Sequence, residues 1–289
     1  MPILAVPQHS VRDMRKIVRL VNKKGLENAE KLNRELKSST HIDVCTQTVR
    51  RALKSEGYFA SNKKKKPLLS IAHRKARMDF AKTYSSWTVE DWKRVIFSNE
   101  TKVNRLCSDG NQYCWKKRGS ALSENHVVPT LKFGGGSIMV WSCFCYSGVG
   151  YEKLILGTMN SDVYISILNE EYLETLNYYE LEVDETYFQH DNDPKHRSKK
   201  TQKWLSDNNI DVLQWPSQSP DLNPIENLWF QVKARLSRYP TIPSSSHELW
   251  ERFVKEWREI PVERCQSLVE SMPNRIRAVL KAKGGYIKY

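Results

Sequence analysis

The chain has 289 residues, of which 39% are hydrophobic, and it carries a formal net charge of +13. This length allows one large domain with a smaller companion, and it excludes a mini-protein that is too short to bury a core. No stretch approaches the roughly 18 consecutive apolar residues of a membrane helix, and the first ten residues lack the pattern of a signal peptide. We therefore expect a protein that neither spans a membrane nor is secreted.

Six cysteines are scattered along the chain, at positions 45, 107, 114, 143, 145 and 265. They form no CxxC pair, and no spacing combines them with histidines in the pattern of a zinc site. We expect reduced, structural thiols.

The positive charge is concentrated near the N-terminus. Residues 1–80 contain 19 basic and 7 acidic residues, a net charge of +12, whereas residues 81–289 contain 27 and 26, a net charge of +1. This distribution predicts an N-terminal module for a polyanion, with nucleic acid as the leading partner. A solvated basic arm would carry the same charge, so both interpretations stay open at this point.

Three short helices are predicted in the basic region, over residues 11–21, 28–36 and 46–56. In the third helix, Val49, Ala52 and Leu53 would face a small core. The opposite side would then be polar and basic, as in a recognition helix that enters the major groove of DNA. The candidate DNA-binding residues of this helix are Thr46, Gln47, Thr48, Arg50, Arg51 and Lys54. Any basic amphipathic helix has this pattern, so a plain surface helix is the alternative.

A run of lysines closed by proline follows, at residues 61–67, and predicts a linker. Its lysines are further candidate DNA contacts, and they could also serve as a nuclear import address. These residues are Lys63, Lys64, Lys65 and Lys66. A linker that is merely solvated explains the run equally well.

Beyond Trp87 the pattern changes to alternating strands and helices. Apolar runs bounded by turn residues predict strands at residues 94–100, 186–191 and 210–216, and two more within 137–159. Helical spacing predicts helices at residues 161–179, 196–209, 223–238, 249–259 and 264–280. The alternation indicates an α/β domain with a mixed sheet.

Two acidic residues lie where strands and helices end. Asp191 terminates the strand at 186–191, and Glu226 falls in the first turn of the helix that Asn223 and Pro224 open. The structural interpretation is that Glu226 caps its own helix, with Asn223 as the N-cap. The functional interpretation is that both carboxylates meet at one edge of the sheet and hold a divalent metal, as phosphodiester cleavage requires.

Four segments give these carboxylates a context: FSNETK (97–102), KFGGGSIMVW (132–141), HDNDPKH (190–196) and WPSQSPDLNPIENLW (215–229). Together they closely resemble the Tc/mariner transposase superfamily, particularly its Sleeping Beauty-like branch, over essentially the whole chain. The resemblance implies a ribonuclease H-like fold and a catalytic triad of two Asp and one Glu, with 34 residues between the last two. Residues 192–225 number 34, so Asp191 and Glu226 match as catalytic residues and metal ligands, whereas Asp193 would leave only 32.

The first triad position departs from the family, because Asn99 stands where its members have Asp. Asparagine keeps an oxygen that can coordinate a metal, but it is neutral, so metal affinity and activity should fall. Glu100 cannot replace it, since successive side chains of a strand point to opposite faces. We expect a strongly impaired enzyme. We leave His190 and His196 outside the catalytic set, because two-metal phosphoryl transfer needs no histidine base.

The resemblance also implies the reaction and the partners. Such a transposase binds terminal inverted repeats in double-stranded DNA, cuts DNA with Mg²⁺ or Mn²⁺, and joins the ends at TA sites as a homodimer in the nucleus. We expect a helix-turn-helix domain at 1–60, a basic linker with a connecting helix at 61–90, a ribonuclease H-like domain at 91–240, and C-terminal helices at 241–289.

A second departure concerns the N-terminus, where residues 10–57 resemble only the second of the family's two helix-turn-helix units. We expect weaker recognition of terminal repeats as a result. The principal alternative function is an inactive or domesticated DNA-binding protein derived from such a transposase. A nuclease that hydrolyses DNA without strand transfer is a third interpretation, which no motif supports.

Overall fold

The computed structural model describes residues 19, 29–40, 45–58, 68–105 and 136–288. The chain packs as two units, Met1–Lys66 and Pro67–Tyr289, which are taken separately below. The helix expected at 11–21, apart from Arg19, and the linker lysines 63–66 lie outside the described residues.

The first unit contains helices α2 (Ala29–Thr40) and α3 (Thr46–Ser55), which pack against each other. Their shared core consists of Leu32, Leu36, Val49 and Ala52, with Leu53 packed beside it. The apolar stripe predicted for the third helix is therefore confirmed.

The second unit is built on a five-stranded sheet in the order β3-β2-β1-β4-β5. Strands β1, β2 and β3 pair antiparallel, whereas β4 and β5 continue the sheet from β1 in parallel. The bounds are β1 Val95–Asn104, β2 Ser137–Cys145, β3 Gly148–Ile155, β4 Tyr187–Gln189 and β5 Asp211–Val212. The mixed sheet is as predicted, but β1 is longer than its apolar run, and β4 and β5 are shorter.

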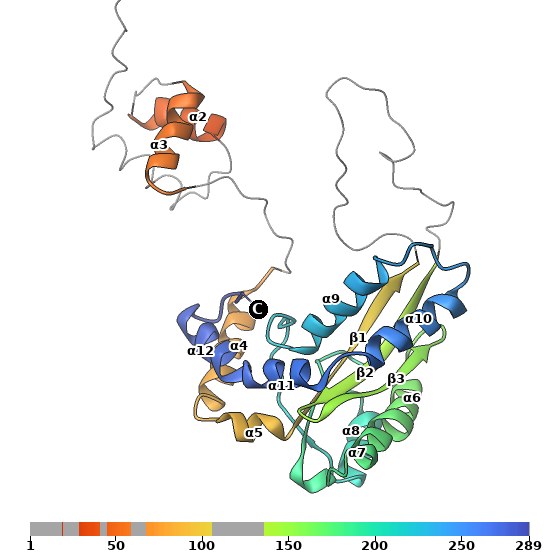
Figure 1. Cartoon of the computed structure of the whole chain (residues 1–289). Helices are drawn as coiled ribbons and strands as arrows, with labels where there is room; N and C mark the ends of the chain where they lie inside the picture. Colours follow the sequence, from red (N-terminus) through yellow and green to blue (C-terminus); the bar gives the residue numbers. More distant parts are fainter. Residues whose placement is uncertain (1–18, 20–28, 41–44, 59–67, 106–135, 289) are drawn as a thin grey trace, which may run out of the picture. The chain divides into compact units, whose positions relative to one another are not determined.

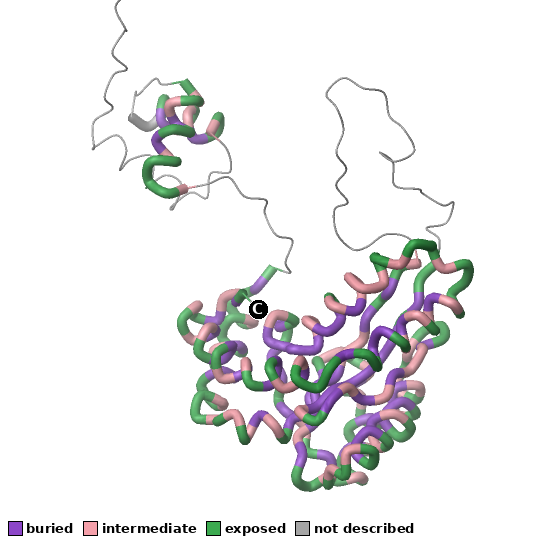
Figure 2. The backbone as a smooth tube through the Cα atoms, viewed as in Figure 1, coloured by how far each residue is buried: buried purple, intermediate pink, exposed green. Residues whose placement is uncertain are grey.

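Helices cover both faces of this sheet, so its central strands are apolar on both sides. On one face, Ile96, Trp141 and Phe188 pack against α6 (Ser161–Ile167), the π-helical turn η3 (Leu168–Tyr172), α7 (Leu173–Tyr178) and α8 (Lys199–Asp207). On the other face, Phe97, Val140 and Phe144 lie in one core with α4 (Ile71–Thr83), α5 (Val89–Lys93), α9 (Ile225–Leu236), α10 (Ser246–Arg258), α11 (Val262–Glu270) and α12 (Met272–Lys281). Figures 1 and 2 show this arrangement, with buried residues along the strands and the inner helix faces.

The C-terminal region differs from its prediction. The helix expected at 264–280 is two helices, α11 and α12, which meet at Ser271. Pro273 explains the break, because proline has no backbone N–H and cannot sit inside a helix, whereas it fits the first turn of a new one. None of the helices in the described part of the chain is both long and apolar enough to cross a membrane.

A buried arginine joins the start of the second unit to its C-terminal end. Arg77 of α4 has no exposed surface, and it binds the carboxylate of Asp221 through two hydrogen bonds of 2.7 and 2.8 Å. It also donates to the carbonyl oxygens of Gly284 and Gly285. Arg275 of α12 donates to the Asp221 carbonyl at 3.2 Å. Since Asp221 lies five residues before Glu226, this network supports the loop that leads into α9.

The backbone at Gly284 requires glycine. Its φ is +75°, and an added Cβ would lie 2.2 Å from the carbonyl oxygen of Arg74. We expect Gly284→Ala to lower the free energy of unfolding by about 2–4 kcal/mol, which combines left-handed strain with the clash. Chemical denaturation measures the loss. Gly157→Ala is the matched control, because Gly157 has a similar φ of +72° but open space around it. Equal losses for both variants would contradict the role of the clash.

Candidate active site

One pocket brings together the three residues that the sequence singled out. Asn99 lies on β1, Asp191 follows β4, and Glu226 is in the first turn of α9. Because β1 and β4 run parallel, with Phe97 paired to Gln189, the positions two residues further on, Asn99 and Asp191, lie at the same level of the sheet, just beyond the end of β4. The pocket has a volume of about 430 Å³ and is lined by Asn99, Asp191, Asn192, Asp193, Trp215, Pro216, Ser217, Gln218, Ser219, Pro220, Asn223 and Glu226.

Asn99 and Glu226 are in direct contact. The side-chain nitrogen Nδ2 of Asn99 donates a hydrogen bond of 2.9 Å to Oε1 of Glu226. The pairing of β1 with β2 is uninterrupted from Phe97 to Asn104, so no bulge turns Glu100 toward the pocket. The amide thus satisfies a carboxylate that an aspartate at this position would repel.

The structural alternative, in which Glu226 caps its own helix, is wrong. Helix α9 has Pro224 as its N-cap, and no side chain caps it. Asn223 accepts a hydrogen bond from the Ile225 amide at 3.3 Å, and its Nδ2 donates to the Ser98 carbonyl at 3.1 Å. Asn223 therefore anchors the start of α9 to β1, which leaves the Glu226 carboxylate directed at Asn99.

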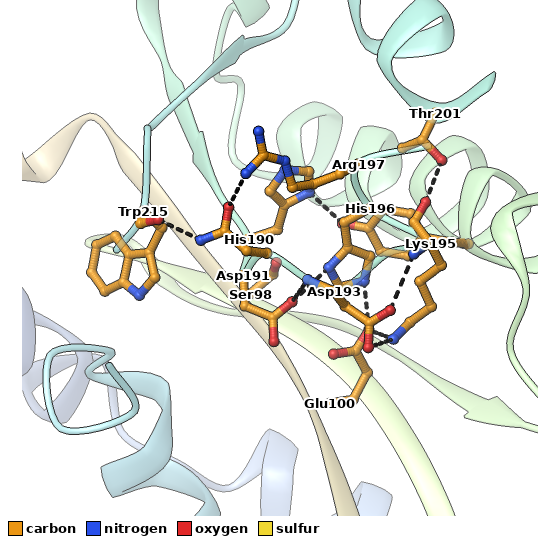
Figure 3. A network of polar contacts seen from close by, with 12 residues as sticks. Ser98, Glu100, His190, Asp191, Asp193, Lys195, His196, Arg197, Thr201 and Trp215 are labelled. Carbon is orange, nitrogen blue, oxygen red and sulfur yellow. Dashed lines mark hydrogen bonds and ion pairs between the residues drawn. The ribbon is translucent and has the colours of Figure 1, made fainter. Parts of the chain in front are cut away.

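A histidine that sequence reasoning set aside holds Asp191 in place (Figure 3). His196 contacts Asp191 Oδ1 through Nδ1 at 2.8 Å and Glu100 Oε1 through Nε2 at 3.1 Å. Both partners are carboxylates, which accept hydrogen bonds, so both ring nitrogens donate and the ring is an imidazolium. The sequence could suggest the contact with Asp191, five residues away, but nothing in it pointed to Glu100, 96 residues away.

The two histidines of this region have opposite charge states. Burial and the charge of His196 lower the pKa of His190 to about 3, so its ring is neutral and Nδ1 pairs with the Tyr164 hydroxyl at 2.9 Å. Burial also acts to lower the pKa of His196, but the hydrogen bonds and charges of Asp191 and Glu100 outweigh it and raise the value to about 9. The two rings stack with centroids 5.1 Å apart.

The two candidate ligands differ in how readily they ionise. Burial acts to raise the pKa of Asp191, but the hydrogen bonds from His196 and from the Asp193 amide give a net lowering. For Glu226 burial prevails and raises the pKa, although Lys233 and the Asn99 amide oppose it. Asp191 therefore ionises more readily and can bind a cation, whereas burial opposes the ionisation of Glu226.

The oxygen donors of this pocket are of the type that binds a divalent cation, but their total negative charge is lower than in the family's triad. Asp191, Glu226 and the side-chain oxygen of Asn99 are the hard ligands that Mg²⁺ and Mn²⁺ prefer. They supply two negative charges where the family's triad supplies three. Among the residues that the structure describes, no three His, Cys, Asp or Glu side chains are grouped as metal ligands.

The charge on His196 predicts how stability depends on pH. Its pKa of about 9 lies above the ordinary 6.5, so its contribution is complete below pH 6.5 and is lost as pH rises through 9. Asp191, Glu100 and the rings of Tyr164 and His190 are the groups that face it. We expect the free energy of unfolding in EDTA to fall by about 2 kcal/mol from pH 6.5 to 8.5, as measured by urea denaturation.

His196→Gln is the control for this dependence, because glutamine does not titrate. The neutral His190 does not interfere, since its stability contribution changes only below pH 6.5. An equally steep loss in the variant would show that another group is responsible.

Six of the candidate DNA-binding residues lie on one helix of the first unit. Gln47, Arg50, Arg51 and Lys54 of α3 are exposed, whereas Thr46 and Thr48 are half-buried. The lysines at 63–66 are not among the described residues.

Two protein families match this sequence. The family described as "Transposase" matches residues 14–86, and the "DDE superfamily endonuclease" family matches residues 108–247. The first match includes α3, the second includes Asp191 and Glu226, and Asn99 lies between the two.

The chain is similar in fold to solved structures of a transposase. The Mos1 transposase paired-end complex with left transposon end superimposes with a TM-score of 0.80 at 18% identity, covering 99% of this chain and 83% of that one. The Mos1 mariner paired-end complex with Mn gives 0.79 at 17% identity, covering 100% and 82%. At these identities the likeness concerns the fold, and it confirms the expected ribonuclease H-like architecture.

Curated relatives are similar in sequence over most of their length. The Tcb1 transposase of Caenorhabditis briggsae is 39% identical over 244 residues, 84% of this chain and 88% of that protein. The Tc1 transposase of Caenorhabditis elegans is 37% identical over 245 residues, with the same two shares covered. The Tcb2 transposase of C. briggsae is 33% identical over 276 residues, 95% of this chain and 99% of that protein. With both family matches, these identities show that the chain belongs to the Tc1/mariner family of transposases.

Proposed function

We propose that this protein binds the terminal inverted repeats of its own transposable element, cuts the DNA there, and joins the freed 3′ ends to target DNA at TA sites. The observation that supports this most is the meeting of Asn99, Asp191 and Glu226 in one pocket of a ribonuclease H-like unit. DDE transposases use divalent metals, and here Asp191, Glu226 and the Asn99 side-chain oxygen would hold Mg²⁺, with Mn²⁺ able to replace it.

When bound, the metal would polarise the scissile phosphate and lower the pKa of the attacking hydroxyl. The residues of this chain would place the DNA strand and the ligands. His196 fixes the rotation of the Asp191 carboxylate, and Glu100 fixes His196 from the other side. Asn223 fixes the start of the helix that carries Glu226. These contacts hold Asp191 and Glu226 in position, so the neutral Asn99 would be the weakest of the three metal ligands.

Catalysis by this chain is proposed to be strongly impaired. A metal that uses Glu226 must compete with the Asn99 amide for the same oxygen, and the site lacks one negative charge. The same contact favours the second candidate function, an inactive or domesticated DNA-binding protein that keeps the fold without the chemistry.

DNA recognition is proposed to rest on the first unit, within a domain division of 1–60, 61–90, 91–240 and 241–289. Residues Thr46, Gln47, Thr48, Arg50, Arg51 and Lys54 would contact the major groove and its phosphates, and Lys63, Lys64, Lys65 and Lys66 would contact the backbone. The partners would be double-stranded DNA and a second copy of the chain, acting in the nucleus.

The DNA-binding role makes a prediction about salt. The logarithm of affinity falls as the logarithm of salt concentration rises. Each phosphate contact that is lost should make this negative slope shallower by about one. We expect Arg50→Ala to make this slope shallower in fluorescence anisotropy titrations with the inverted repeats. Lys153→Ala, on the second unit, is the control, because that lysine pairs with Glu170 and Glu171. An unchanged slope for Arg50→Ala would show that this residue makes no phosphate contact.

A cleavage assay tests the proposed function as a whole. Full-length protein is incubated with Mg²⁺ or Mn²⁺ and a labelled duplex that carries the inverted repeat flanking its coding sequence. Weak, metal-dependent nicking at the repeat end is the expected result. Binding without any nicking, both in this chain and in Asn99→Asp, would favour the adopted DNA-binding protein instead.

A further inference from the structure

A phenylalanine on α9 lies outside both hydrophobic cores of the second unit. The inner face of this helix buries Ile225, Leu228, Trp229 and Val232, whereas Phe230 is 76% exposed. Among the large apolar side chains exposed in the described part of the chain, it is the one inside a helix, since Ile71, Tyr178 and Val262 lie at helix ends. A phenylalanine ring left in water forgoes the stabilisation of burial, so this ring is available to a ligand or partner.

The spacing along α9 places Phe230 on the same side of the helix as Glu226. Residues four and seven positions apart on a helix share one side, so Glu226, Phe230 and Lys233 form a line. Glu226 lines the pocket, and Lys233 lies close enough for its positive charge to act on the Glu226 carboxyl group. The helix is anchored by its buried face, so the ring is held one turn beyond the pocket.

An aromatic ring and a cation that lie on the same side of α9 as the proposed cleavage site can together contact one nucleotide of a DNA strand. A base can stack on the ring while the neighbouring phosphate approaches the lysine. We propose that Phe230 stacks against an unpaired base of the DNA strand whose phosphate enters the pocket, and that Lys233 contacts the next phosphate. The base is unpaired because bases inside a duplex are covered on both faces by their neighbours. This inference rests on the proposed function.

The test uses full-length protein and two duplexes that carry the flanking inverted repeat, in Mg²⁺. One duplex ends in an unpaired 2-aminopurine next to the cut 3′ end, and the other is fully paired. Stacking on an aromatic ring quenches 2-aminopurine, so the chain should quench the first duplex, and Phe230→Ala should abolish this effect. We also expect about tenfold weaker binding of that duplex, the cost of one lost stacked base, with no change for the paired one.

Three further variants separate stacking from other roles. Phe230→Trp should keep the quenching, whereas Phe230→Leu, which is apolar but not aromatic, should lose it. Tyr178→Ala is the matched control, because Tyr178 is an aromatic residue that is 65% exposed on α7, which packs on the opposite face of the sheet. Lys233→Ala should weaken binding of the unpaired-base duplex and make its salt slope shallower by about one.

The outcomes are distinguishable. Quenching by this chain that persists in Phe230→Ala would overturn the inference and leave the proposed function standing. Loss of self-association in Phe230→Ala, seen by sedimentation with quenching intact, would likewise overturn it and assign the ring to a contact between copies. Failure of this chain to bind either duplex would count against the proposed function itself, and the stacking role would fall with it.

Discussion

Replacing Asn99 by Asp is expected to raise metal-dependent nicking at the terminal inverted repeats about a hundredfold. The substitution restores the third negative charge and removes the amide that now donates to Glu226. A metal ligand that stabilises the transition state by about 3 kcal/mol corresponds to a rate factor of this size. Single-turnover nicking assays in Mg²⁺ measure the gain. Asn99→Ala is the control, and it should be no more active than the present chain.

The same substitution should change stability in a way that does not depend on activity. Without metal, an aspartate at position 99 places a second carboxylate against Glu226, so the thermal midpoint of Asn99→Asp should fall below that of the present chain. Adding Mn²⁺ should then raise the midpoint of Asn99→Asp more than that of the present chain, because ligand binding stabilises the folded state. Equal Mn²⁺ responses and equal nicking rates would contradict the view that Asn99 weakens the metal site.

Spacing along the chain predicted the members of the site better than it predicted their contacts. Asp191 and Glu226 stood out at a strand end and a helix start, the resemblance to the transposase family assigned them as ligands, and the structure places both in one pocket. The interpretation of Glu226 as a helix cap failed, because local sequence shows which side chains can cap but not which distant partner competes. Here the competitor is Asn99, 127 residues away.

The role of His196 was hidden for a similar reason. Its ring joins Asp191 to Glu100, and that geometry exists only once β1 and β4 are paired in parallel. The elements themselves were predictable where hydrophobic periodicity was strong, as in α3 and β2. The short strands β4 and β5 were predicted in the right places but too long, because β5 has only two paired residues and its length is set by its neighbour rather than by its own sequence.

Breaking the buried pair of Arg77 and Asp221 is expected to have the largest effect on stability. Asp221→Ala leaves the Arg77 guanidinium, which has no exposed surface, without its carboxylate, and it also removes the acceptor of the Ile287 amide. Removing one partner of a buried ion pair costs about 3–5 kcal/mol, because the remaining charge stays buried and unpaired. Urea denaturation of Asp221→Ala and Arg77→Ala should show losses of this size.

The double variant Arg77→Met with Asp221→Leu separates unpaired charge from lost packing. It removes both charges and keeps apolar volume, so its loss should be smaller than that of Asp221→Ala. Exposed ion pairs contribute little, so Lys203→Ala, which breaks a surface pair with Asp207, should cost less than about 1 kcal/mol. If the double variant were as unstable as Asp221→Ala, the network would act through shape rather than charge. In either case the loop between Trp215 and Asn223 would lose its support, so nicking by an Asn99→Asp background should fall along with stability.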